Sequence, residues 1–97
     1  MEYEIQFAPE AVRDFRRLLA RVRSSVKEAI ERHLRYGPER ISKSRIKKLR
    51  GISRPHYRLR VDEIRVFYDV EGQAVQILAI IPKSKATAWL HEMGDRK

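Results

Sequence analysis

The 97-residue chain contains no cysteine, which excludes disulfide bonds and thiolate metal ligands and fits a reducing compartment. Its three histidines, His33, His56 and His91, lack the short spacing of a metal site, so we expect no metal or other cofactor. The longest apolar run, 74–81, is too short for a membrane span of about 20 residues. Nothing at the start is typical of a signal peptide. We therefore expect a cytoplasmic protein without membrane contact.

Acidic side chains are scarce. The chain has 13 Asp and Glu against 22 Lys and Arg, for a formal net charge of +9. Between positions 40 and 60 there are nine Lys or Arg residues and no Asp or Glu. Such a charge excess predicts an anionic partner such as nucleic acid.

The length suits a single domain, which we place at 1–97. Residues 2–7 alternate apolar and polar side chains and predict a strand. Pro9 suits the first turn of a helix with an apolar stripe to Val22. Ser25 and Glu28 match a capping box, which predicts a second, antiparallel helix, although one bent helix also fits. The basic connector 40–55 shows no regular spacing of apolar residues, which predicts a loop anchored by Ile46 and Leu49.

Residues 56–70 alternate strictly and predict a hairpin with Asp62 and Glu63 as its turn. A turn at 71–73 leads to an apolar strand at 75–81, which we expect to be central. A short helix follows, with an apolar stripe that includes Trp89. The predicted fold is a small α+β domain: an N-terminal strand, a two-helix hairpin, a three-stranded antiparallel sheet segment and a short C-terminal helix.

The hairpin places Arg58, Arg60 and Arg65 on one face, with Arg60 opposite Arg65. Like charges across a strand pair are unfavourable by up to about 1 kcal/mol. Either the guanidiniums are exposed and paired with nearby carboxylates, or they form a phosphate site. Phe67 on the same face either stacks on an unpaired base or packs beneath the C-terminal segment. His56, opposite Asp69, is either a proton acceptor or a paired surface histidine.

No glycine-rich phosphate loop, metal cluster or nucleophile elbow is present. One reaction fits Arg, Lys, His and Tyr alone, namely attack of an RNA 2′-hydroxyl on its own 3′ phosphate. The substrate supplies the nucleophile, so the protein need only hold geometry, stabilise charge and move protons.

The order of predicted elements, together with PHYRLRVDEIRVFYDV and ILAIIPKSKATAWL, resembles the RelE/ParE superfamily of bacterial toxins. The resemblance extends from Tyr3 to about Met93 and is most specific at positions 57–68. It implies either a RelE-like endonuclease that cuts mRNA in the ribosomal A site or a ParE-like inhibitor of DNA gyrase. Both kinds are neutralised by a co-expressed antitoxin.

The resemblance implies phosphate contacts for Arg58, Arg60 and Arg65, and a role after the last strand for Lys83 and Lys85. The sequence departs from RelE-like enzymes in having no tyrosine after position 68. We also assign RNA contacts to the connector and the hairpin, at Lys43, Arg45, Lys47, Lys48, Arg50, Arg54 and Phe67.

The leading hypothesis is a ribosome-dependent mRNA endonuclease toxin in which His56 is the proton acceptor. We expect the Arg65 side chain to be exposed, so that Arg65→Ala would abolish cleavage and leave the fold intact. The alternatives are a ParE-like gyrase inhibitor without nuclease activity and a non-toxic RNA-binding module. In both toxin hypotheses the expected partner is a cognate acidic antitoxin. It would cover the arginine face or displace the C-terminal helix.

Overall fold

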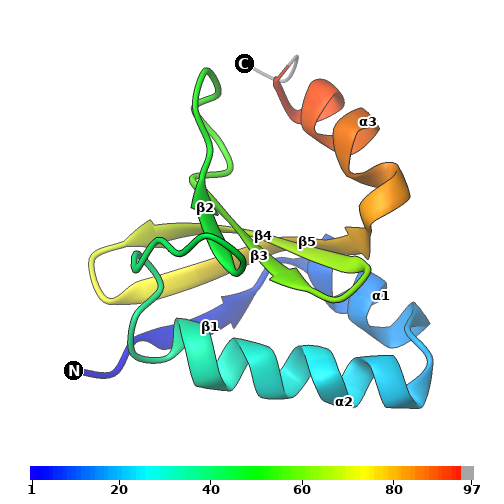
Figure 1. Ribbon diagram of the computed structural model, residues 1–97, viewed down its shortest axis with the longest axis horizontal. Helices are drawn as coiled ribbons and strands as arrows, with labels where there is room; N and C mark the ends of the chain where they lie inside the picture. The colour runs from blue at the N-terminus through cyan, green and yellow to red at the C-terminus, as the bar shows by residue number, and fades with distance from the viewer. Residues whose placement is uncertain (95–97) are drawn as a thin grey trace.

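The computed structural model describes residues 1–94, and a five-stranded sheet runs through the middle of this region (Figure 1). In chain order the elements are β1 (Glu4–Phe7), α1 (Pro9–Arg17), α2 (Ala20–Ala29), the π-helical segment η1 (Ile30–Leu34), β2 (Ile46–Lys48), β3 (Tyr57–Val61), β4 (Ile64–Glu71), β5 (Ala74–Pro82) and α3 (Lys83–Gly94). The strand order is β1-β5-β4-β3-β2. Because β1 is parallel to β5 and the other pairs are antiparallel, the predicted α+β domain has a mixed sheet.

The β3–β4 hairpin has the predicted register. Val61 pairs with Ile64, Arg60 with Arg65, and Tyr57 with Tyr68. The turn requires a positive φ of 52° at Asp62, which a short polar side chain tolerates better than most. Strand β5 lies between β1 and β4, as its apolar sequence predicts.

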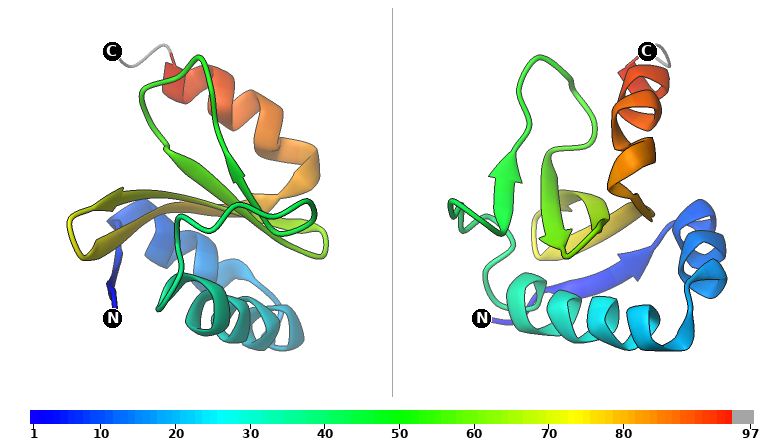
Figure 2. Two further views of the ribbon diagram at one scale, coloured as in Figure 1. Left: turned by 60° about the vertical axis from the view of Figure 1, so that its left-hand side comes forward. Right: turned by 45° about the vertical axis from the view of Figure 1, so that its right-hand side comes forward.

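The break between α1 and α2 lies at Leu18 and Leu19, where both residues are extended. The predicted capping box was wrong, because Ser25 lies inside α2. The helix breaks at Leu18 and Leu19 because this places the apolar side chains of Val26, Ile30 and Leu34, from α2 and η1, in the buried core. The helices splay apart from this elbow rather than lying side by side (Figure 2).

The basic connector contains a short strand, β2, where the sequence predicted only a loop. Ile46 pairs with Leu59 of β3, and both side chains are buried. The exposed charges beside Ile46 hid this strand from the sequence pattern, but β2 covers an edge of β3 that would otherwise be unpaired. Leu49, the other predicted anchor, is half-buried.

The core lies between the inner face of the sheet and the helices α1, α2 and η1. Its buried members include Leu59, Val66 and Tyr68 from β3 and β4. The Tyr68 hydroxyl donates to the Pro38 carbonyl at 2.6 Å, and burial raises the pKa of Tyr68. Helix α3 lies over the opposite, outer face of the sheet (Figures 1 and 2). None of its residues is fully buried.

Candidate nucleic-acid interface

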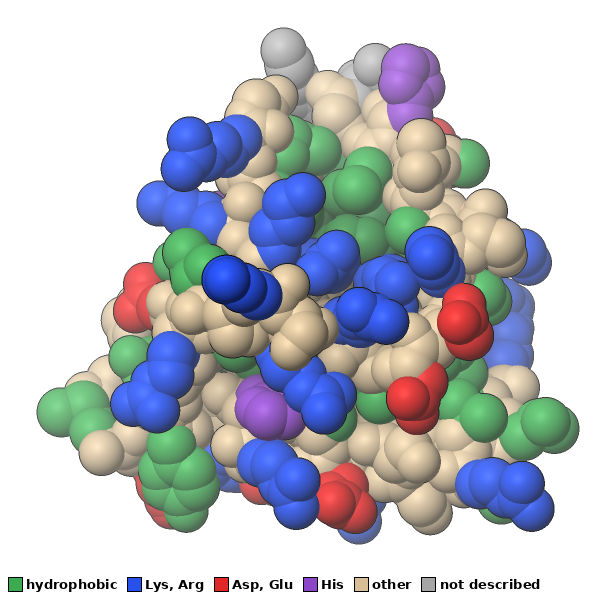
Figure 3. Space-filling model, viewed as in Figure 1, with side chains coloured by type: hydrophobic (Ala, Val, Ile, Leu, Met, Phe, Trp, Pro, Cys, Tyr) green, Lys and Arg blue, Asp and Glu red, His purple; other side chains and the backbone are tan. Residues whose placement is uncertain are grey.

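Four basic side chains occupy the outer face of β2, β3 and β4. Arg58 is paired with Lys47 across β2 and β3, and Arg60 with Arg65 across β3 and β4. Directly paired residues of neighbouring strands share a face of the sheet. We call Lys47, Arg58, Arg60 and Arg65 the cationic face. Lys and Arg side chains gather across the middle of this side of the molecule, beneath a hollow bordered by hydrophobic side chains (Figure 3).

Arg58 is the least satisfied member of the cationic face. Its side chain is half-buried, and within residues 1–94 its buried Nε has no hydrogen-bond partner. Burial, followed by the charges of Arg65 and Arg60, lowers the pKa of Arg58 below its usual range. A guanidinium in this setting is still protonated at neutral pH. An anion beside it would relieve the repulsion and supply the missing acceptor.

Arg65 is buried, with 6% of its surface exposed, so the prediction of an exposed side chain was wrong. Its Nη1 donates to the carbonyls of Asp62 at 2.8 Å and Ile64 at 3.0 Å. The Arg65 side chain therefore stabilises the hairpin turn through these two carbonyls. Arg60, its cross-strand partner, is exposed and has no side-chain partner in the described part of the chain.

Phe67 is fully buried beneath α3, which is the second of the two positions considered for it. Its ring stacks on Trp89 with centroids 4.9 Å apart and planes 19° apart. The Trp89 indole N–H also donates to Glu10 Oε1 at 3.3 Å. A nucleic-acid base has no access to Phe67 while α3 is in this place, so the predicted base contact is incompatible with this conformation.

His56 belongs to a network centred on Asp69, which is fully buried. Asp69 accepts hydrogen bonds from Arg54 Nε at 2.7 Å and from the His56 backbone N–H at 2.8 Å. The His56 Nδ1 accepts the Val70 N–H at 3.2 Å, which requires this nitrogen to be unprotonated. Its lone pair is thus engaged, and proton transfer to Nδ1 would require this bond to break. The network ties the loop before β3 to the sheet.

The other predicted site residues are spread more widely. Lys83 and Lys85 are exposed at the start of α3, and the Lys83 N–H donates to the Glu63 carbonyl beside the hairpin turn. Lys43, Lys48 and Arg50 are exposed along the connector. Arg54 is drawn to Asp69. Arg45 instead lies beside η1, where its charge acts on His33.

The tips of two segments meet above the cationic face. Ile52, in the loop before β3, lies against Gly94 at the end of α3. A cavity of about 180 Å³ lies between them, lined by residues 51–53 and Gly94. The loop and α3 thus border the hollow in Figure 3, and access to the hollow depends on where they lie.

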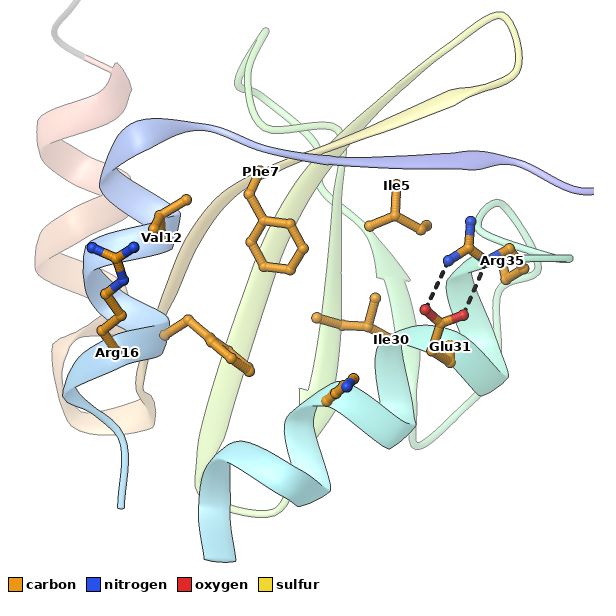
Figure 4. Close-up of a pocket in the computed structure, with 9 residues that line it drawn as sticks. Ile5, Phe7, Val12, Arg16, Ile30, Glu31 and Arg35 are labelled. Atoms are coloured by element: carbon orange, nitrogen blue, oxygen red, sulfur yellow. Dashed lines mark hydrogen bonds and ion pairs between the residues drawn. The ribbon is translucent and has the colours of Figure 1, made fainter. Parts of the chain in front are cut away.

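A second groove lies on the other side of the sheet, between the splayed helices and β1 (Figure 4). It has a volume of about 470 Å³ and a largely apolar lining that includes Phe7, Phe15 and Ile30. At its rim Arg35 and Glu31 pair at 2.7 Å, which lowers the pKa of the Glu31 carboxyl. An apolar groove open to solvent is typical of a surface that contacts another protein.

Sequence reasoning missed a pocket at the end of η1 that is lined by Arg32, His33, Tyr36, Arg40 and Arg45, among others. The one available signal in the sequence was Tyr36, a tyrosine among basic residues.

Within residues 1–94, no group of three or more His, Cys, Asp or Glu could hold a metal ion. No helix in the same region is long and apolar enough to cross a membrane.

Comparison with known proteins identifies the family. The profile of the ParE toxin of type II toxin–antitoxin systems, parDE, matches residues 5–87. The comparison with curated proteins gave no match. The fold is similar to a variant of the E. coli toxin RelE in the free state, with a TM-score of 0.72 and 22% identity over 99% of this chain and 97% of that one.

Two solved toxin–antitoxin complexes are also similar. The RelBE2 complex from Mycobacterium tuberculosis gives a TM-score of 0.71 and 24% identity, covering 84% of this chain and 99% of that one. The archaeal RelE–RelB complex from Pyrococcus horikoshii gives a TM-score of 0.70 and 25% identity, covering 88% of this chain and 99% of that one. The fold is that of the RelE/ParE superfamily. Because the family profile matches most of the length of this chain, the chain belongs to the ParE toxin family of type II toxin–antitoxin systems.

Proposed function

We propose that this toxin cuts messenger RNA at the ribosome by promoting attack of an RNA 2′-hydroxyl on the adjacent phosphate. The observation that supports this most strongly is the cationic face, where the buried Nε of Arg58 has no partner within residues 1–94. A phosphate oxygen is the acceptor that such a guanidinium lacks. The reaction places its nucleophile in the substrate, which suits a site made of Arg and Lys.

In the proposed step the 2′-oxygen forms a bond to phosphorus while the bond from phosphorus to the 5′-oxygen breaks. The products are a 2′,3′-cyclic phosphate and a free 5′-hydroxyl. Negative charge grows on the non-bridging oxygens in the transition state, and Arg58 and Arg60 would stabilise it. Removing one donor of this kind from an active site commonly lowers kcat by about 10²- to 10³-fold.

Arg65 would act as a positioning residue, since its Nη1 is engaged by the carbonyls of the turn. Lys83 or Lys85 would protonate the leaving 5′-oxygen. His56 remains our prediction for the acceptor of the 2′-hydroxyl proton, and it would have to release the Val70 N–H first.

The connector would bind ribosomal RNA and so orient the cationic face toward the message. Its exposed cations Lys43, Lys48 and Arg50 have no ion-pair partners within the described residues. Phosphate contacts of this kind position a protein on RNA without reading its sequence.

We also propose an acidic antitoxin as partner, because solved relatives are complexes of RelE with RelB. Its charge would complement the +9 of this chain. The apolar groove beside β1 offers the antitoxin one contact surface. The antitoxin would alternatively displace α3, none of whose residues is fully buried.

Primer extension on a defined message in a purified translation system tests the activity. Wild-type protein should produce new ends inside ribosome-occupied codons. A message with one 2′-deoxynucleotide immediately before a mapped cut should lose that cut and keep the others, since the nucleophile is missing there. An intact message at every site would rule out the nuclease.

Gyrase inhibition is the second candidate, favoured by the ParE family match and by the lack of a tyrosine after position 68. Under this hypothesis the cationic face docks on an acidic protein surface. A supercoiling assay that traps gyrase–DNA complexes while messages stay intact would select it. Harmless expression without any antitoxin would instead favour a non-toxic RNA-binding module.

A further inference from the structure

A pocket of about 250 Å³ lies where η1, the segment after it and β2 meet. It is separate from the cationic face, and none of the four residues of that face lines it. Basic and aromatic side chains dominate its lining, namely Arg32, His33, Tyr36, Arg40 and Arg45. No role in the proposed cleavage step falls to any of them.

The cations of this pocket are largely unneutralised. Arg40 and Arg45 form no ion pair within the described part of the chain. Arg32 contacts Glu28 at 3.3 Å, but both side chains are about 70% exposed, and such surface pairs contribute little. Burial, followed by the charges of Arg45 and Arg32, lowers the pKa of His33. The pocket therefore has a positive field that an anion would relieve.

An aromatic ring stands at the edge of the same pocket. Tyr36 is 63% exposed, and no other ring within residues 1–94 stacks on it. A large exposed aromatic beside guanidinium groups combines the two elements of single-strand recognition, because the ring stacks on a base while the cations hold the phosphate.

The pocket is held in shape and connected to the cationic face. Ser42 Oγ accepts the N–H groups of Arg45 at 3.0 Å and Ile46 at 3.3 Å. The carbonyl of Arg45 accepts the N–H of Arg60 at 2.8 Å. Segment 42–46 thus positions Arg45 of the pocket and is hydrogen-bonded to Arg60 of the cationic face. An extended polyanion could contact both.

We propose that this pocket is a second RNA subsite, which holds one nucleotide of a single strand at a distance from the scissile phosphate. The Tyr36 ring stacks on its base, and Arg40 and Arg45 bind phosphates. The choice of RNA as ligand rests on the proposed function. The subsite would anchor a strand that crosses β2 toward Arg60.

The test uses the binding of a fluorescent single-stranded 2′-O-methyl RNA, which cannot be cut because its nucleophile is blocked. Anisotropy titrations over a range of salt compare wild type with Tyr36→Ala and with the double variant Arg40→Gln/Arg45→Gln. The matched control is Arg17→Gln/Arg21→Gln, which removes two exposed charges outside the pocket. Thermal unfolding verifies that each variant is folded.

Tyr36→Ala should weaken binding by about fivefold or more, the range seen when a base loses its stacking partner. The slope of log affinity against log salt is negative, and the pocket double variant should make it less steep by about 1.4, at about 0.7 for each lost phosphate contact on a single strand. The control double variant should leave the slope unchanged, because its cations touch no phosphate.

The subsite would be overturned if the two double variants have equal salt slopes and Tyr36→Ala binds the RNA as tightly as wild type. This holds even if the pocket variants no longer retain an acidic antitoxin. The outcome is independent of catalysis. If the pocket variants lose binding while wild type cuts no message, the subsite stands and the proposed nuclease fails. If Arg58→Gln, titrated in the same way, weakens binding while the pocket variants bind as wild type, and wild type cuts the message, the subsite fails and the proposed nuclease stands.

Discussion

Replacing Arg65 by alanine should destabilise the fold, contrary to what an exposed hairpin arginine would do. The Arg65 side chain is 6% exposed, and its Nη1 donates to the carbonyls of Asp62 and Ile64 at 2.8 and 3.0 Å. The alanine variant loses both hydrogen bonds and leaves a space beneath the turn. A loss of nuclease activity in this variant would therefore not identify a catalytic role.

The magnitude follows from opposing contributions. Hydrogen bonds from a charged donor are each worth about 1.5–3 kcal/mol, which gives an upper bound of about 6 kcal/mol for two. Removing Arg65 also relieves its repulsion with Arg60, by up to about 1 kcal/mol, and removes a partly desolvated charge. We expect a net decrease of about 2–4 kcal/mol in the free energy of unfolding.

Urea denaturation followed by far-UV circular dichroism measures this difference. With m-values of about 1–2 kcal/mol/M for a small domain, the midpoint should fall by about 1–4 M. Arg60→Ala is the matched control, since it removes the same cross-strand repulsion without touching the turn. It should stay within about 0.5 kcal/mol of wild type. Equal urea midpoints for Arg65→Ala and Arg60→Ala would refute the conclusion that Arg65 stabilises the hairpin turn.

Three further variants test other parts of the structure. Tyr68→Phe leaves the Pro38 carbonyl without its buried donor, and the free energy of unfolding should fall by about 1–3 kcal/mol in the same urea assay, whereas no change would show that water replaces the hydroxyl. Trp89→Ala uncovers Phe67, so α3 amides should exchange hydrogen faster while those of β4 and β5 do not, and Trp89→Phe should restore protection by keeping a stacked ring. Desolvation raises the pKa of Asp14, so the folded state holds this proton more tightly than the unfolded state, and that contribution to stability is lost as pH rises through the folded pKa. Asp14→Asn should therefore lose less stability than wild type between pH 4 and pH 7, and parallel pH profiles would contradict the shift.

The hairpin shows how much of the fold the sequence contained. Strict alternation over positions 56–70 determined both faces and the register, because a one-residue slip would expose Leu59 and Val66. The central place of β5 followed from its apolar residues on both faces. These features depend on local periodicity alone, so one sequence was enough.

Other features depended on tertiary contacts. The parallel pairing of β1 with β5 brings together residues about 70 positions apart, and no local pattern encodes it. The elbow at Leu18 and Leu19 carries no side-chain cap, and the packing of α2 overrides the capping box at Ser25. Strand β2 is too short to show alternation.

The candidate site was predicted in composition but not in exposure. Alternation placed Arg58, Arg60 and Arg65 on one face, as observed. It could not show that α3 folds back over Phe67, or that the hairpin turn encloses Arg65. Burial of an outward-facing residue depends on which element covers it, and this depends on the whole fold.

The central claim is that the cationic face stabilises the phosphate of a cleaved message. The most direct measurement is the single-turnover rate of message cleavage on programmed ribosomes by wild type, Arg58→Gln and Arg21→Gln, each verified as folded. The account predicts a loss of about 10²- to 10³-fold for Arg58→Gln, as for other transition-state donors, and little change for Arg21→Gln. Equal rates for the two variants would contradict it and would leave the cationic face as a docking surface for another macromolecule.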